Sequence, residues 1–196
     1  MKKILLVLSL LPLSLLAQLR DSVYVKTDIF LAVYSEVLQQ PKWVTYTVQC
    51  PNGKAPRTGM DFYTNDSIKT SDNADYVDNV YDKGHCAPAA DFNCTKEMLY
   101  KTFTYLNCVL QNQYLNRGVW RLLEAYERDL AATTGVTVKI KMVYSSTSIK
   151  LPTGATVPDG FYKIITYNNK VEKYYFPNTK PTSSDFKQYL VKWNPN

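Results

Sequence analysis

The sequence lacks the residue patterns on which the commonest protein metal sites depend. It has one histidine, His85, in 196 residues and no cysteines spaced as Cys-x-x-Cys, so a zinc site is not expected. Six aspartates fall in the polar, turn-rich segment 61–82, but without the D-x-D/N-x-D/N-G spacing of a calcium-binding loop. Internal repeats and low-complexity segments are also absent, which excludes a repeat array.

After residue 17 the chain has no hydrophobic run long enough to cross a membrane. Residues 1–17 are typical of a secretory signal, because Lys2 and Lys3 precede an apolar run over residues 4–16 and Ala17 is a small residue at the cleavage position. We therefore predict a signal peptide over 1–17 and a single domain over 18–196. The mature protein should be secreted or periplasmic, with no membrane contact once the signal is removed.

Charge and cysteine content add two weaker constraints. The formal net charge is +6, and a mild positive excess favours anionic partners without proving one. The four cysteines, Cys50, Cys86, Cys94 and Cys108, form an even set in a chain bound for an oxidising compartment. We expect one or two disulfides, and the spacing does not choose among the three full pairings.

Strand patterns occur both before and after one long helical pattern. Strands are predicted over residues 43–48, 81–86 and 136–142, and a hairpin over 161–176 turns at Asn168-Asn169. Thr95 is a candidate N-cap for a helix, residues 105–112 look like a connector, and apolar spacing predicts a helix over 114–132. This order favours an α+β domain with a mostly antiparallel sheet and flanking helices.

The stretch from Asp82 to Arg128 carries the candidate chemistry. His85, which ordinarily titrates near neutral pH, is preceded by Asp82 and followed on the helix by Asn116 and Glu124. On a continuous α-helix Asn116, Glu124 and Arg128 share one side, with about 12 Å along the axis between the first two. One ion could then be shared only if one group binds directly and the other through water, which suits magnesium. Taken singly, Asn116 and Glu124 are more typical of a solvated helix surface, and a lone histidine such as His85 is more often a hydrogen-bonded structural residue than a catalytic one.

Read together, the motifs form an ordered set. They are Arg57, Phe62, Asp66, Tyr81-Asp82-Lys83-Gly84-His85, Pro88-Ala89-Ala90-Asp91, Thr102-Phe103, Asn107, Gln111, Asn116-Arg117-Gly118, Trp120-Arg121-Leu122-Leu123-Glu124, Val157-Pro158 and Phe161-Tyr162-Lys163. This set resembles the DNA/RNA non-specific endonuclease family, a ββα-metal or His-Me finger group that includes secreted bacterial nucleases and mitochondrial endonuclease G. The resemblance covers residues 43–176 and departs from the usual pattern at Lys83, where arginine is common, and at Leu110, where proline is common.

The resemblance implies metal-dependent hydrolysis of phosphodiester bonds in DNA and RNA. By matching position, His85 looks like the general base, and Asn116 like the direct ligand of one magnesium ion, with manganese as an alternative. Products would carry 5′-phosphate ends. Further implied roles are metal-water contacts for Glu124 and Asp82, phosphate contacts for Arg57 and Arg128, substrate contacts for Lys83 and Arg117, and positioning of the histidine loop or a substrate oxygen for Asn107.

The sequence leaves two alternative functions open. The fold could serve as a non-catalytic module that binds nucleic acid or a protein. Alternatively, a secreted hydrolase could use Cys86 or a serine as nucleophile and His85 as base, although adjacent side chains on an extended segment face opposite sides.

Overall fold

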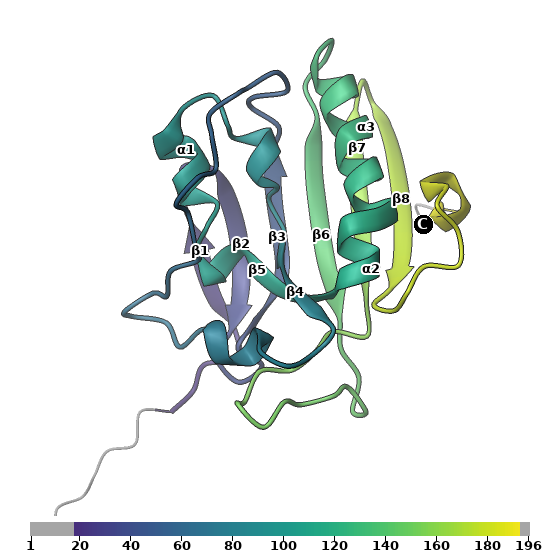
Figure 1. Ribbon diagram of the computed structural model, residues 1–196. Coiled ribbons are helices and arrows are strands. Elements are labelled where there is room, and N and C mark those ends of the chain that lie inside the picture. Colours follow the sequence, from purple (N-terminus) through teal and green to yellow (C-terminus); the bar gives the residue numbers. More distant parts are fainter. Residues whose placement is uncertain (1–17, 193–196) are drawn as a thin grey trace, which may run out of the picture.

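The computed structural model describes residues 18–192, so the predicted signal peptide lies outside the described part. Its largest element is a six-stranded antiparallel sheet with the strand order β1-β2-β3-β6-β7-β8 (Figure 1). The strands are β1 (Val23–Lys26), β2 (Phe30–Ser35), β3 (Gln40–Thr47), β6 (Thr137–Val143), β7 (Gly160–Tyr167) and β8 (Lys170–Pro177).

Strand β6 shows why the sheet has one buried face. Its residues alternate strictly between exposed positions, such as Lys139 and Lys141, and buried ones, such as Ile140. The turn from β7 to β8 is the predicted one, because Asn168 and Asn169 have φ angles of 44° and 59°, which asparagine tolerates better than most residues.

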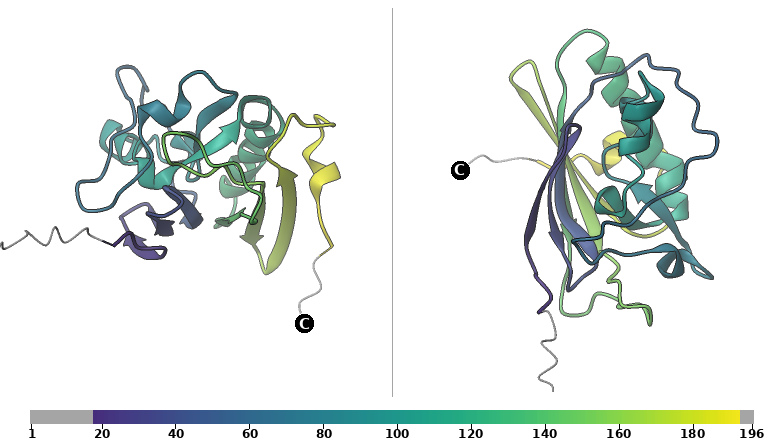
Figure 2. Two further views of the ribbon diagram at one scale, coloured as in Figure 1. Left: turned by 90° about the horizontal axis from the view of Figure 1, so that it is seen from below. Right: turned by 90° about the vertical axis from the view of Figure 1, so that its left-hand side faces the viewer.

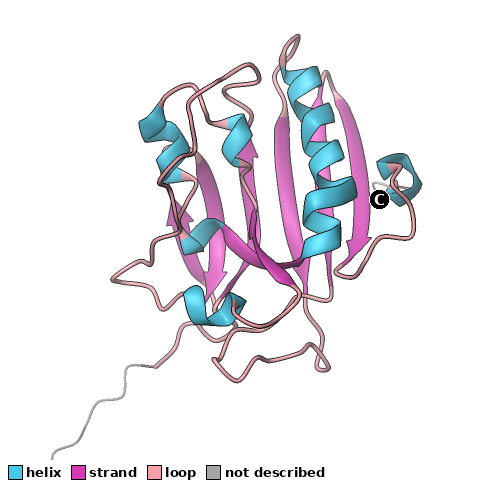
Figure 3. Cartoon of the chain, viewed as in Figure 1, coloured by secondary structure: helices cyan, strands magenta, loops and turns pink. Residues whose placement is uncertain are grey.

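A second layer, made of helices and one small two-stranded sheet, covers the buried face of the six-stranded sheet (Figure 2, right, and Figure 3). It contains the antiparallel pair β4 (Tyr81–His85) and β5 (Cys108–Asn112). The helical elements are α1 (Lys96–Lys101), α2 (Gln113–Leu115), the π-helical turn η4 (Asn116–Trp120) and α3 (Arg121–Ala131), together with the 3-10 turns η1 (Asn73–Tyr76), η2 (Ala89–Asp91), η3 (Tyr105–Asn107) and η5 (Phe186–Tyr189).

Trp120 joins the two layers. Its ring lies 5.5 Å, centroid to centroid, from both Phe161 on β7 and Phe176 on β8, and all three side chains are buried. The fold is therefore α+β with a mostly antiparallel sheet, and β4, β5 and α2–α3 follow one another as the predicted ββα unit.

Two secondary-structure predictions were wrong. The expected connector over 105–112 contains strand β5, all five residues of which are buried, so no polar alternation marked it as a strand. The helix expected over 114–132 is not continuous, because Gly118 has non-helical angles (φ −99°, ψ −118°) inside η4. Glycine adopts such a conformation without steric cost.

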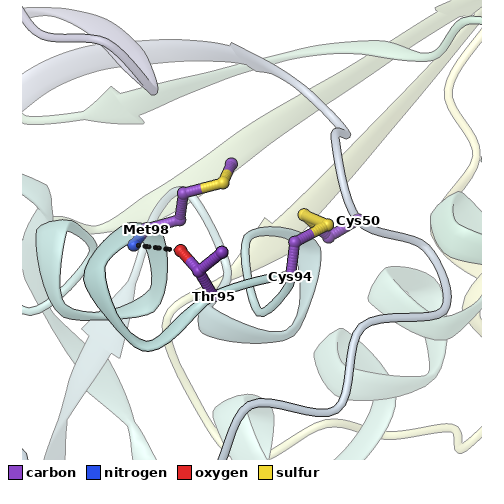
Figure 4. The surroundings of a disulfide bond; sticks show 4 residues. All are labelled: Cys50, Cys94, Thr95 and Met98. Carbon is purple, nitrogen blue, oxygen red and sulfur yellow. Dashed lines mark hydrogen bonds between the residues drawn. A yellow bond between two sulfur atoms is a disulfide. The ribbon is translucent and has the colours of Figure 1, made fainter.

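The structure selects one disulfide among the four candidate cysteines. Cys50 and Cys94 are bonded, and Cys94 directly precedes Thr95, whose hydroxyl accepts a hydrogen bond from the backbone N–H of Met98 and caps α1 (Figure 4). The bond ties the segment after β3 to the start of α1. Cys86 and Cys108 are buried free thiols. Cys108 is the cross-strand partner of His85, and Cys86, which follows His85, points to the opposite face, so the two thiols do not face each other.

Within residues 18–192, no helix has the length and hydrophobicity needed to span a bilayer.

Candidate active site

A cleft of about 490 Å³ opens in the second layer beside β4 and α3. The charged side chains that line the cleft are mainly cationic, and the two carboxylates among them are Asp61 and Glu124. The cations that line the cleft are Arg57, Lys83, Arg117, Arg121 and Arg128. Such a concentration of positive charge in a concave surface favours a phosphate-bearing ligand.

His85 lies at the end of β4 and lines the cleft between two aromatic rings. Its ring centroid is 4.6 Å from that of Phe62 and 4.7 Å from that of Phe103. Burial of the imidazole and the nearby Arg57 guanidinium lower the pKa of His85 to about 3. Its Nε2 atom is buried and has no hydrogen-bond partner among the described residues. With its pKa lowered the imidazole is neutral, and a neutral imidazole has one ring nitrogen that can accept a proton.

Asn107 holds the backbone that follows the histidine. Its side-chain oxygen accepts a hydrogen bond from the Ala87 N–H at 2.7 Å, and its Nδ2 donates to the carbonyls of Ala87 and Thr102 at 2.9 and 3.0 Å. The residue is fully buried. These contacts favour the first of its two predicted roles, positioning of the histidine loop.

Asn116, Asp82 and Arg117 form a connected group at the mouth of the ββα unit. The Asn116 Nδ2 donates to Asp82 Oδ2 at 2.9 Å, and Arg117 bonds the same carboxylate at 2.8 and 2.5 Å. Because its Nδ2 is occupied, the Oδ1 of Asn116 is the amide atom that remains for a cation. Both oxygens of Asp82 have donors, so Asp82 orients the amide of Asn116.

The π turn η4 changes the geometry expected for Asn116 and Glu124. The continuous α-helix from which that separation was calculated is not present, since the chain departs from α-helical angles at Gly118. Both residues nevertheless line the same cleft. Single π turns inside helices are frequent at functional sites.

Glu124 and Arg128 lie one turn apart on α3. Burial raises the pKa of Glu124 to about 7, an effect that the nearby Lys163 ammonium opposes. Arg128 Nη1 donates to Asp91 Oδ1 at 2.9 Å, and Asp91 is fully buried. Burial and the neighbouring carboxylates of Glu127 and Glu124 raise the pKa of Asp91, and the Arg128 guanidinium opposes that rise. Asp91 thus fixes the position of Arg128.

Lys83 takes part in a separate set of contacts in the cleft. Its ammonium donates to Asp61 at 2.8 Å and to the side-chain oxygen of Asn73, and it lies 5.8 Å from the ring centroid of Phe62. Lysine keeps the positive charge in this position but lacks the planar fork of arginine.

Several residues in or behind the cleft were given no role from the sequence. Arg121 lines the cleft and donates to the Arg117 carbonyl at 3.2 Å, and its spacing of four residues from Arg117 was the available signal. Behind the cleft, Glu127 accepts a hydrogen bond from Tyr46 at 2.8 Å and pairs with Lys163 at 2.7 Å. The signal for Lys163 was a charged residue on the buried side of a strand.

The chemistry of these side chains fits a divalent cation with few protein ligands. Among residues 18–192 no cluster of three or more His, Cys, Asp or Glu residues could hold a metal ion. Magnesium keeps several of its waters and needs only one or two protein oxygens. Asn116 can supply one such oxygen. Glu124, a carboxylate on the same helical segment, lines the same cleft.

Comparison with known proteins gives a family and a structural relative. A family model described as DNA/RNA non-specific endonuclease matches residues 17–195. The solved structure of an EndoG/EndoGI complex, described as showing the mechanism of EndoG inhibition, superimposes with a TM-score of 0.76 at 25% sequence identity. That match covers 86% of this chain and 80% of the other.

Curated relatives match over shorter stretches. Mitochondrial nuclease EXOG of Danio rerio is 32% identical over 102 residues, which is 50% of this chain and 30% of the relative. Mitochondrial endonuclease G of Bos taurus is 34% identical over 84 residues, 41% of this chain and 28% of the relative. A nuclease of Nostoc is 30% identical over 129 residues, 59% of this chain and 47% of the relative. The chain thus spans less than half the length of each of these three relatives.

Proposed function

The chain belongs to the DNA/RNA non-specific endonuclease family, and on that premise we propose that it hydrolyses phosphodiester bonds of both DNA and RNA with a divalent metal ion. Magnesium is the proposed ion, and manganese the alternative. The observation that carries the proposal is the position of the His85 imidazole in a cleft lined by five cationic side chains.

His85 is the proposed general base. With its pKa lowered to about 3, the imidazole is neutral at working pH and accepts a proton from the water that attacks phosphorus. The bond from phosphorus to the 3′ oxygen breaks and that oxygen takes a proton from solvent, which leaves a 3′-hydroxyl and a 5′-phosphate. Asn107 keeps the loop after His85 in place through its bonds to Ala87.

The remaining roles divide between the metal and the phosphate. Asn116 would hold the ion directly, Glu124 would bind a metal water, and Asp82 would orient Asn116 and contact the water shell. A bound magnesium ion supplies stabilisation of negative charge on the phosphate and the leaving oxygen. Arg57 and Arg128 hold phosphate oxygens with paired donors, and Lys83 and Arg117 contact neighbouring parts of the substrate.

We further propose that residues 1–17 are a signal peptide and that residues 18–196 form one secreted or periplasmic nuclease domain. The Cys50–Cys94 disulfide supports this location, because disulfides persist in oxidising compartments. The rival hydrolase with Cys86 as nucleophile is not supported, since Cys86 is 1% exposed and burial raises the pKa of its thiol.

Cleavage of plasmid DNA and of RNA by residues 18–196 tests the proposal, with EDTA and the His85→Ala variant as controls. We expect cleavage of both substrates that requires magnesium or manganese, and product ends that a ligase accepts without prior phosphorylation. Nucleic-acid binding without cleavage at any metal concentration would favour the non-catalytic module. Cleavage that resists EDTA would contradict the metal requirement.

A further inference from the structure

The face of the six-stranded sheet that points away from the cleft, here called the outer face, carries two continuous rows of side chains. Residues directly opposite on neighbouring strands share a face, so the pairing registers define each row. The first row is Tyr24, Val33, Trp43, Lys141, Tyr162 and Tyr175. The second row is Lys26, Leu31, Thr45, Lys139, Ile164 and Lys173.

The outer face is accessible in the described part of the protein. Every member of the two rows is at least partly exposed, and Tyr24 is 62% exposed. In Figure 2 (right) the helices and the β4–β5 pair lie on the opposite side of the sheet. Strands in a sheet are about 4.8 Å apart, so each row spans about 24 Å.

Aromatic rings and ammonium groups are interleaved on this surface. The Tyr24 and Trp43 rings are in contact with their centroids 6.4 Å apart, and the Tyr162 and Tyr175 rings with theirs 4.9 Å apart. Lys141 lies between these two ring pairs in the first row. The two ring pairs therefore flank a central cation.

The second row adds ammonium groups over the rings. Lys139 Nζ lies 4.8 Å from the Trp43 ring centroid and Lys173 Nζ lies 4.3 Å from that of Tyr162. No member of either row is acidic. A hollow of about 450 Å³ beside Lys141 and Tyr162 contains one carboxylate, Asp21, which is bonded by Lys42 at 3.0 Å. The surface is thus cationic and aromatic together.

Two kinds of occupant would bury such a surface. A second copy of the chain packed face to face would bury Lys139 and Lys141 in one interface with the same lysines of its partner, and buried like charges are costly. Single-stranded nucleic acid has the complementary chemistry, since phosphates attract the ammonium groups and unpaired bases stack on exposed rings.

We propose that the outer face is a second nucleic-acid site that binds single-stranded DNA or RNA at a distance from the cleft. The proposal takes its ligand class from the proposed function but does not require cleavage. Because the sheet separates the two surfaces, a short oligonucleotide reaches only one of them, whereas a long strand can contact both.

Binding is measured in the His85→Ala background with EDTA, using a fluorescent thymidine oligonucleotide and a duplex of equal length. The test variant is Lys139→Gln with Lys141→Gln, and the matched control is Lys150→Gln with Lys187→Gln, which removes the same charge from exposed positions outside both the rows and the cleft. We expect the test pair to weaken single-strand binding about tenfold and to lower the log–log salt slope by about 1.4. The control pair should change affinity less than about threefold.

Trp43→Ala examines stacking separately from charge, with thermal unfolding as a check that the fold is kept. It should weaken single-strand binding by about fivefold or more, because one base loses its stacking surface. Equal affinity for single strand and duplex in the His85→Ala protein without outer-face substitutions would overturn the assignment to single strands.

Lysine acetylation read by mass spectrometry locates the contact. Lys139 and Lys141 should be protected by the oligonucleotide and Lys150 should not. Normal cleavage without this protection would overturn the second site alone, whereas protection in a protein that never cleaves would overturn the proposed function alone. Protection that rises with protein concentration in the absence of nucleic acid would assign the face to a second copy and overturn the proposal.

Discussion

His85 owes its neutral state to side chains that come from distant parts of the chain. The rings of Phe62 and Phe103 lie within 5 Å of the imidazole ring, centroid to centroid, although they precede and follow it by about twenty residues. The sequence was sufficient to identify His85, because no other histidine exists. Its burial and the effect of Arg57 on its pKa depend on how these segments pack, so the lowered pKa could not be predicted.

That lowered pKa gives a prediction for stability against pH. The pKa of His85 falls from 6.5 to about 3 on folding, so the folded state disfavours the protonated ring. The contribution of His85 to the free energy of unfolding is therefore present above about pH 6.5 and is lost as the pH falls toward 3. The free energy of unfolding of the wild-type protein, minus that of His85→Ala, should decline through this window in urea titrations with EDTA. A difference that stays constant through the window would show that the imidazole is not desolvated.

At the scale of elements, the sequence identified the strands and helices in which apolar residues recur with a clear period and missed those without such a period. Strand β6 alternates and was found, whereas β5 is buried at every position and was taken for a connector. Gly118 gave no signal that the helix would be interrupted, because a single glycine inside an apolar helical pattern is tolerated. The ββα unit itself followed from the resemblance and is confirmed, but the pairing of β4 with β5 came only from the structure.

Gly84 controls how closely β4 and β5 approach each other. A Cβ atom at this position would lie 2.5 Å from the side-chain oxygen and 2.7 Å from the Cβ of Gln111 on β5. Gly84→Ala should therefore lower the free energy of unfolding by about 1–3 kcal/mol and reduce cleavage, because β4 carries His85. The control is Gly135→Ala, where an added Cβ meets nothing within 4 Å. Equal stability of the two variants in urea titrations would refute this account.

At the scale of the whole molecule, a buried ion pair joins the helical layer to the large sheet. Lys163 on β7 and Glu127 on α3 are both fully buried, 2.7 Å apart, and the Lys163 ammonium also lies 4.4 Å from the Trp120 ring centroid. The sequence placed Lys163 on a strand and Glu127 on a helix. Their pairing across two layers depends on the angle at which α3 crosses the sheet, which no local pattern specifies.

Breaking this pair should be costly, because the partner is left as an uncompensated buried charge. Lys163→Met is expected to lower the free energy of unfolding by about 3–5 kcal/mol. Lys101→Met removes a lysine from the exposed pair with Asp28, and that change should cost about 0–1 kcal/mol. Chemical denaturation of both variants gives the comparison, and similar losses in the two proteins would mean that burial adds nothing to the Lys163 pair.

The central claim is a division of roles in one cleft, with His85 acting on the proton and Asn116 holding the metal ion. Single-turnover cleavage of one DNA substrate across a magnesium titration tests it, using the wild-type protein, His85→Ala and Asn116→Ala. We expect His85→Ala to remain nearly inactive at every magnesium concentration and Asn116→Ala to regain cleavage as magnesium rises, because only the second defect is one of metal affinity. Wild-type rates in His85→Ala, or an unchanged magnesium requirement in Asn116→Ala, would contradict the account.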